Sequence, residues 1–515
     1  MSYRNRREFL SDVGRGMLVA GLGSATAFEL GLARGFAEEP ESRLTFGPLE
    51  PLVSLMQESP LDKLLSALVQ KLESGVDLKT LVSSAALANA RAFGGEDYTG
   101  YHTFMALVPA YQMAGELPKA RQALPVLKVL YRNTSRIQET GSNAKDVLHP
   151  IEGEHIPDRS GQQLLDAIHS ADLQAAENQF AGLVEASPKM AYNNLQQVVQ
   201  EEVNVHRVVL AWRAWAMLDL TGDQFAHTML RQSVRFCIDH EQELIKRKAT
   251  PSAIRTLVPK LLDQYRLLEK PLGKRKAEDR WIEELAQIIF SGTRDQAAEA
   301  VAAALAEGID PEDIGEAMSI AANLLVLHDP GRLEKYSNAQ KPPGCVHGDS
   351  VGVHASDAAN AWRCIARVSN PRNTIASLIV GAYHTAGQTA MVTKEPYPFA
   401  KRLDDITSDD PAKLLHQAEE AIQTNDQALA CAVAHRYGEL NLSSRPMFDL
   451  MLKYAVSEDG ALHAEKYYRT VSEEFAQMRD AFRWREVVAL ARVTASEHGF
   501  AAPGYSESCD LLGLT

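Results

Sequence analysis

The sequence predicts an all-α fold, and three observations support this prediction. Between residues 60 and 500, apolar residues recur at the spacing of amphipathic helices. Alanine, leucine, glutamate and glutamine, which form helices readily, dominate this region. Alternating runs of β-branched residues, which are typical of strands, are few. With 515 residues, 45% of them hydrophobic and 23% charged, the chain is an ordinary folded protein of two or three domains.

The chain is acidic, with a formal net charge of −14 when histidines are neutral. Binding to phosphate requires concentrated lysine and arginine, so this charge argues against nucleic acid or anionic lipid as the main partner. We expect a small-molecule substrate instead. The oligomeric state is left open, because an internal duplication would already provide what a homodimer provides.

The N-terminal residues 1–37 resemble a twin-arginine export signal. Arg6 and Arg7 precede Phe-Leu and a short, Gly/Ala-rich apolar stretch, and Ala37 is a suitable small residue for cleavage. That stretch is too short for a stable membrane span, which needs about 20 apolar residues. We therefore expect export by the twin-arginine translocation machinery to the periplasm or beyond, with residues 38–60 as a linker.

Removal of this signal would leave 48 basic and 64 acidic residues, a formal charge of −16. The resemblance implies a protein that folds before export, often because a cofactor is inserted first. Thiol-bound cofactors are unexpected, because the five cysteines are scattered with no C-x-x-C or C-x-x-C-H motif. The odd number also predicts few or no structural disulfides.

A tandem duplication is predicted from an internal repeat, in which residues 67–81 align with residues 301–314. Each copy has a helix, a glycine after its C-terminus, an aspartate at the next N-cap and a second helix. The matching pairs are Gly75 with Gly308 and Asp77 with Asp310. Pro311 then occupies the first position of its helix, where proline is favoured.

The repeat defines the predicted domain organisation. A first helical half spans residues 61–268, a charged Pro/Gly linker spans 269–280, a second half spans 281–500, and residues 501–515 form a tail. The two halves are expected to pack about a pseudo-twofold axis.

Four of the fifteen histidines recur at matching positions in these halves. The pattern D-x-x-G-x-H occurs at Asp97 to His102 and again at Asp349 to His354. In it, the glycine would allow close approach of a neighbouring backbone or ligand. The aspartate could cap the helix, orient the imidazole or act as a general base, so Asp97 and Asp349 are candidate catalytic residues.

A second pattern, [ED]-x-x-x-H, pairs Glu202 with His206 and Asp459 with His463. Residues four apart share one face of a helix, so a carboxylate and an imidazole could converge on one metal ion. The predicted ligands are therefore His102, His206, His354, His463, Glu202 and Asp459. Iron, copper, manganese and zinc all accept such ligands, and the sequence does not choose among them.

Two further questions stay open at this point. The halves could form one shared site with up to four histidines, or two equivalent sites. A structural origin is also possible, since duplicated domains keep caps, close-packing glycines and hydrogen-bonded core histidines in both copies.

The segment 305–317, LAEGIDPEDIGEA, looks like the helix-turn-helix of carboxymuconolactone decarboxylase and alkyl hydroperoxidase D-type proteins. This resemblance implies an all-α fold with a His-containing pocket between helices; the chain lacks the C-x-x-C that the peroxidase branch uses, so disulfide chemistry is not carried over. Long helices with paired histidines are also similar to the questin oxidase-like family, which would imply an oxygenase-type activity.

The expected function is an exported metal-dependent enzyme, most simply an oxidoreductase with a His/carboxylate site built from both halves. One alternative is a non-catalytic periplasmic helical-repeat protein that binds a partner. A second alternative is a metal-dependent hydrolase or lyase. Motifs of serine hydrolases, P-loop proteins, Rossmann folds and zincins do not occur in the sequence.

Overall fold

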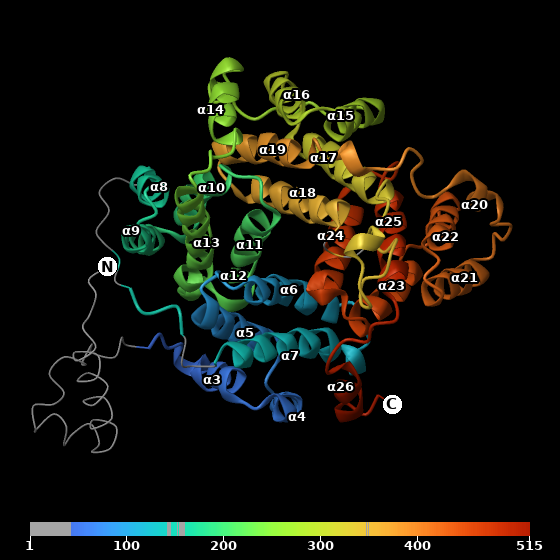
Figure 1. The fold of residues 1–515 in the computed structure, drawn as a ribbon, viewed down its shortest axis with the longest axis horizontal. Coiled ribbons are helices and arrows are strands. Elements are labelled where there is room, and N and C mark those ends of the chain that lie inside the picture. The colour runs from blue at the N-terminus through green and yellow to red at the C-terminus, as the bar shows by residue number, and fades with distance from the viewer. Residues whose placement is uncertain are drawn as a thin grey trace, which may run out of the picture. The chain divides into compact units, whose positions relative to one another are not determined.

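The computed structural model describes residues 43–141, 146–151, 153, 160–346, 348 and 350–514, and Phe46–Thr515 forms one compact unit (Figure 1). Its described part consists of helices without strands, which confirms the predicted all-α class. The predicted export signal, residues 1–37, lies outside the described residues. The α-helices are α3 (Glu50–Glu58), α4 (Leu61–Glu73), α5 (Leu78–Phe93), α6 (Tyr98–Ala114), α7 (Ala123–Thr140), α8 (Gln162–His169), α9 (Leu173–Ala186), α10 (Pro188–Val199), α11 (Val205–Ala216), α12 (Leu218–Thr221), α13 (Ala226–Arg247), α14 (Ile254–Gln264), α15 (Asp279–Ser291), α16 (Arg294–Ala306), α17 (Pro311–Leu327), α18 (Val351–Val368), α19 (Pro371–Thr385), α20 (Ala400–Asp404), α21 (Pro411–Gln423), α22 (Gln427–Glu439), α23 (Arg445–Ser457), α24 (His463–Gln477), α25 (Trp484–Glu497) and α26 (Tyr505–Leu511).

Short 3-10 helices occur between some of these elements. They are η1 (Gly47–Leu49), η2 (Lys119–Arg121), η4 (Asp223–Phe225), η5 (Glu334–Tyr336), η6 (Thr389–Met391) and η7 (Gly460–Leu462).

Four helices form a closed ring in the middle of the compact unit. α6 packs against α11, α11 against α18, α18 against α24, and α24 again against α6 (Figure 1). Two of them, α6 and α11, come from the first predicted half, and α18 and α24 come from the second. Further helices flank the ring, with α5 and α7 beside α6, α17 and α19 beside α18, and α25 beside α24.

The local signals of the repeat are confirmed in both copies. Gly75 and Gly308 have φ values of +97° and +79°, in the left-handed region that glycine enters without a steric penalty. The side chain of Asp77 caps α5 by accepting from the backbone N–H of Thr80, and Asp310 caps α17 in the same way. These caps satisfy N–H groups that otherwise lack a partner at a helix start.

Helices or irregular backbone occupy three of the predicted linker and tail segments. The predicted linker 38–60 contains α3, whose Val53 and Met56 are buried, and the predicted tail 501–515 contains α26. Residues 269–280 are largely irregular as predicted, but they do not separate two compact units. The charged, Pro/Gly-containing composition of residues 269–280 indicated that the helical pattern is interrupted there. Composition does not show whether the helices before and after this segment pack against each other. The duplication itself stays a prediction.

Glycine brings α18 into close contact with α17, as expected for the glycine of the D-x-x-G-x-H pattern. A Cβ atom at Gly352 would lie 2.5 Å from the backbone nitrogen of Val326. At the matching position, a Cβ at Gly100 would lie 2.5 Å from the ring of Phe93. Both glycines therefore set the approach of a helix that carries one of the four histidines.

We expect Gly352→Ala to lower the free energy of unfolding by about 1–3 kcal/mol, because the added methyl group meets backbone rather than a movable side chain. Gly115→Ala is a suitable control, since Gly115 has ordinary helical φ and ψ and lies at the end of α6. Urea denaturation of both variants measures the difference. Equal unfolding midpoints for the two variants would contradict this packing role.

Within the described part of the chain, no helix is both long and apolar enough to cross a membrane. The five cysteines are all free thiols, four of them buried.

Candidate functional site

The four histidines singled out by the repeat meet at the centre of the helix ring. The imidazole centroid of His102 lies 4.7 Å from that of His206 and 5.2 Å from that of His463. His354 closes the cycle, at 5.7 Å from His206 and 5.6 Å from His463. Each imidazole therefore touches two others, and the four form one shared cluster, which we call the histidine ring.

Each histidine lies in the first five residues of its helix. His463 begins α24, His206 is the second residue of α11, His354 the fourth of α18 and His102 the fifth of α6. The positive ends of four helix dipoles consequently converge on the histidine ring. This arrangement disfavours protonated imidazoles and favours neutral ones or a bound anion.

The helix starts are defined by capping residues close to the histidines. Asp97 caps α6 by accepting from the N–H of Gly100 at 2.7 Å, and Ser350 caps α18 by accepting from the N–H of Val353. Asn204 caps α11 and accepts from the N–H of His206 itself at 2.9 Å. The caps therefore fix the positions from which the imidazoles extend.

Backbone carbonyls define the tautomer of two of the imidazoles. The Nδ1 atom of His102 lies 2.7 Å from the carbonyl oxygen of Tyr98, and Nδ1 of His463 lies 3.2 Å from that of Ala461. A carbonyl only accepts, so Nδ1 carries the proton and Nε2 carries the lone pair. This arrangement is typical of metal-ligating histidines.

Within the histidine ring, the Nε2 atoms of His102 and His206 are buried and have no hydrogen-bond partner among the described residues. Burial lowers the pKa of His102 to about 2, and the nearby charge of Lys466 contributes to this shift. Burial likewise lowers the pKa of His206 to about 3. Both side chains are therefore neutral at physiological pH, with a buried lone pair that nothing in the described chain satisfies.

These imidazoles come together from positions as far apart as residues 102 and 463. No protein-family model, curated protein or solved structure matches this chain. What the histidine ring can do therefore follows from its own geometry and chemistry.

The histidine ring is not a finished coordination site. Among the described residues, no group of three or more His, Cys, Asp or Glu side chains is placed so that it could hold a metal ion as it stands. The neighbouring rings are also tilted by 50° to 78° relative to one another. Binding of an ion would therefore require the imidazoles to turn inward.

The carboxylates predicted as ligands do not share a helix with their histidines. Glu202 lies in the turn before α11, accepts from the N–H of Val203 and is 3.6 Å from His240. Asp459 precedes η7 and is ion-paired with Arg132. The expectation that each carboxylate and histidine lie on one helical face is therefore wrong.

Of the two candidate catalytic aspartates, Asp97 lies within the described residues. Besides capping α6, Asp97 accepts from Arg136, with oxygen–nitrogen distances of 3.0 and 2.7 Å. Although burial opposes it, these bonds to Arg136 and Gly100 hold the pKa of Asp97 below its usual value. Asp97 therefore has the contacts of a capping residue, one of the predicted roles. Asp349 lies outside the described residues.

Two buried charged residues lie one helical turn below the histidine ring and were not singled out in the sequence. Asp357 follows His354 by three residues on α18, and Lys466 follows His463 by three residues on α24. Burial raises the pKa of Asp357 and lowers that of Lys466 to about 8, while their mutual attraction opposes both shifts. Asp357 also accepts from the hydroxyl of Thr470 at 2.8 Å. A search for polar residues three positions after each histidine could have found this layer.

Tyrosine rings border the histidine ring on its solvent side. Tyr98 is 59% exposed, yet its ring centroid lies 4.4 Å from that of His102. Tyr101 stacks on His102 at 5.0 Å and contacts His206 at 5.3 Å. His206 and His354 are partly exposed, whereas the other two histidines are buried. Two of the four histidines therefore keep some exposed surface.

The low histidine pKa values predict acid lability of the metal-free protein. An unfolded histidine has a pKa near 6.5, so below that pH the unfolded state binds protons that His102 and His206 reject. Stability is therefore complete above pH 6.5 and is lost as pH falls towards the folded values. We expect a loss of about 1 kcal/mol per histidine between pH 7 and 5.5.

Urea denaturation as a function of pH measures this loss in the wild-type chain and in His206→Gln. The variant should lose less stability than the wild type over the same pH interval. Equal slopes for the two proteins would contradict the assignment of neutral, buried imidazoles.

Proposed function

We propose that the histidine ring binds one transition-metal ion and is the centre of a metal-dependent oxidoreductase. The observation that carries this proposal is the convergence of four imidazoles from four helices at centroid distances of 4.7 to 5.7 Å. A single shared site uses both predicted halves of the chain. A structural role would instead require hydrogen-bond partners for the buried nitrogens, and two of these nitrogens have none in the described chain.

The distances fit convergence on one ion. Four imidazoles bound through Nε2 at about 2.1 Å would place neighbouring ring centroids roughly 5 Å apart. The fixed Nδ1–H groups of His102 and His463 leave Nε2 as the ligand atom. Small rotations of the imidazoles would complete the site, and the energy of two unsatisfied buried nitrogens, about 1–3 kcal/mol each, favours such rotations.

The electrical environment favours redox chemistry over hydrolysis. His102 and His206 are neutral, four helix N-termini point at the site, and the buried Lys466 and Asp357 lie one turn below it. The positive helix ends stabilise the less charged, reduced state of a metal and attract an anionic ligand to an open position. Iron and copper, which accept imidazole ligands, would supply one-electron chemistry here.

The protein residues have distinct parts in this proposal. His102 and His463 hold their ligand nitrogens in position through backbone carbonyls, and Asp97 fixes the start of α6. Lys466 and Asp357 can hold or release a proton beneath the centre, because burial brings their pKa values closer together. Tyr98 lies at the solvent side, where a substrate would approach.

Metal analysis of the purified protein, folded in the cytoplasm before export, tests the proposal. We expect close to one equivalent of iron or copper per chain after loading and removal of loosely bound ions. Less than about a tenth of an equivalent of any transition metal, under several loading conditions, would contradict it and would favour a non-catalytic helical protein.

We also propose export by the twin-arginine route, supported by the order of the paired arginines, the apolar stretch and Ala37. We expect Arg6→Lys/Arg7→Lys to leave most of the protein in the cytoplasm of an expressing bacterium. Cell fractionation measures this, and Arg4→Lys is the control. Unchanged export of the double variant would contradict the assignment.

A further inference from the structure

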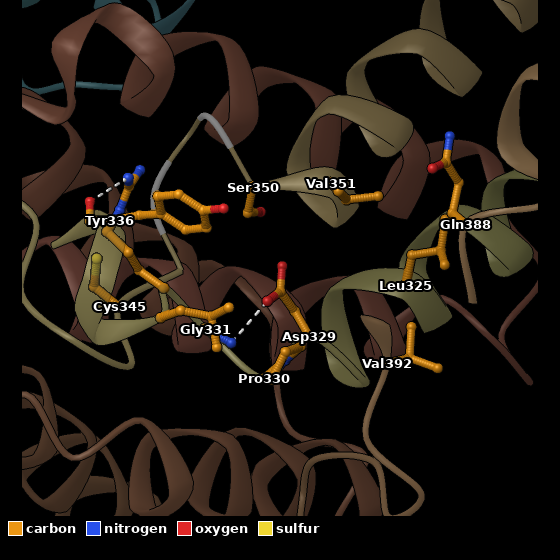
Figure 2. A pocket seen from close by; sticks show the side chains of 12 residues that line it. Leu325, Asp329, Pro330, Gly331, Tyr336, Cys345, Ser350, Val351, Gln388 and Val392 are labelled. Atoms are coloured by element: carbon orange, nitrogen blue, oxygen red, sulfur yellow. Dashed lines mark hydrogen bonds between the residues drawn. The ribbon is translucent and has the colours of Figure 1, made fainter. Parts of the chain in front are cut away.

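A pocket opens at the N-terminal end of α18, the helix that carries His354. It has a volume of about 300 Å³. Its wall comes from the end of α17, the loop that follows it, the start of α18 and the segment around η6 (Figure 2). This volume lies at the lower end of the range of natural small-molecule sites.

Exposed apolar side chains are concentrated in the lining of this pocket. Eight large hydrophobic residues of the described chain are exposed, and three of them line this one pocket. They are Leu333, Tyr336 and Val351, with 39%, 61% and 47% of their surface accessible. Clustered exposed apolar surface of this kind marks binding sites.

One carboxylate gives the pocket a polar point. Asp329 accepts from the backbone N–H of Gly331 at 2.7 Å, and Figure 2 shows its side chain pointing towards the space between Tyr336, Ser350 and Val351. The carboxylate can accept a further hydrogen bond from a ligand. Arg332 also lines the pocket, and its guanidinium donates to the backbone carbonyl of Tyr336. The lining thus suits a mainly apolar molecule that donates a hydrogen bond to Asp329.

The pocket wall includes the start of the helix that carries His354. Ser350 and Val351 begin α18, and the carbonyl of Ser350 accepts from the N–H of His354 at 3.1 Å. On the same segment, Gly348 packs so closely on His463 that a Cβ atom there would lie 2.0 Å from its Cβ. A ligand in the pocket would therefore contact the chain that positions two of the four histidines.

We infer that this pocket binds the substrate of the proposed metal centre, a small and mainly apolar molecule that donates a hydrogen bond to Asp329. The substrate role depends on the proposed function, but the binding itself does not. The two can therefore be tested separately.

The binding test uses 1-naphthol, a fluorescent apolar molecule with one hydroxyl group, on the metal-free full-length protein. We expect one site per chain and weaker binding of naphthalene, which lacks the hydroxyl group. Tyr336→Ser should weaken naphthol binding at least about fivefold through lost apolar contact. The control Leu268→Ser, which removes an exposed apolar side chain outside the pocket, should bind as the wild type does.

Asp329→Asn tests the polar point, because the amide oxygen can still accept from Gly331. We expect the preference for naphthol over naphthalene to fall about five- to tenfold. Equal binding by the wild type and Tyr336→Ser, or an unchanged preference in Asp329→Asn, would overturn the pocket assignment.

The substrate role is tested with the copper-loaded protein. Paramagnetic copper(II) in the histidine ring should broaden the proton resonances of bound naphthol, and His102→Ala should abolish this effect while leaving naphthol bound. Unbroadened resonances in the copper-loaded wild type would overturn the substrate role. Failure to load copper would contradict the metal centre, and the naphthol titrations would still decide the pocket.

Discussion

His102→Ala is expected to lower the affinity of the protein for copper(II) more than about 100-fold. Loss of a group that only supports a metal ligand costs 10- to 100-fold, so loss of the ligand itself should cost at least the upper value. His102 is also held firmly, because it is buried, hydrogen-bonded through Nδ1 and in contact with two other imidazoles. Competition with a chelator of known affinity measures the change.

The comparison among variants distinguishes a shared site from two independent ones. If the histidine ring is one site, His102→Ala and His354→Ala each abolish the single tight equivalent, although they belong to different halves. If there were two sites, each variant would retain one equivalent. His416→Ala is the matched control, because its side chain is 72% exposed and lies away from the ring.

Unchanged copper affinity in His102→Ala, with thermal unfolding showing an intact fold, would rule out the histidine ring as the metal centre. If His102→Ala is destabilised, His102→Gln can be used instead, because glutamine keeps a polar side chain of similar size and lacks the imidazole. Both variants should fail to bind in the same way.

The sequence identified the four histidines because each stands near the start of a helix in a recurring pattern. Asp97 and the glycine of D-x-x-G-x-H are local signals, and local signals depend on residues three to five positions apart. The same reasoning failed for Glu202 and Asp459, because a shared helical face requires both residues to be inside the helix. Asn204, a strong N-cap, already indicated that α11 begins after Glu202.

The packing of the two halves against each other could not be predicted in this way. The contacts of α6 with α24 and of α11 with α18 join segments separated by well over a hundred residues. Hydrophobic periodicity shows that a helix has an apolar face, but it does not show which helix covers that face. The spacing of Asp357 and Lys466 after two of the histidines is a local signal, but their burial against each other depends on the packing of α18 on α24.

A buried ion pair joins the two predicted halves of the chain, and its loss is expected to destabilise the protein strongly. Lys128 on α7 lies 2.7 Å from a carboxylate oxygen of Glu465 on α24, and both side chains are almost fully buried. The ammonium group also donates to the backbone carbonyls of Ala455, at 2.9 Å, and Glu458. One cation therefore donates to two carbonyls of the second half and is ion-paired with Glu465, which follows His463 by two residues.

Lys128→Met is expected to lower the free energy of unfolding by about 3–5 kcal/mol, because it leaves a buried carboxylate without its counter-charge. Lys128→Met/Glu465→Leu should recover part of this loss, since the double variant removes both charges. It should not recover all of it, because the carbonyls of Ala455 and Glu458 stay unsatisfied. Urea denaturation followed by circular dichroism measures the three proteins.

The exposed pair of Arg280 and Glu284 provides the control, since Arg280→Met should change stability by less than about 0.5 kcal/mol. If Lys128→Met unfolded as Arg280→Met does, the ion pair would not join the halves. If it is destabilised as expected, its metal affinity should also fall, because α24 carries His463 at its first residue and Glu465 two residues later. The histidine ring would then depend on the same contact that holds the two halves together.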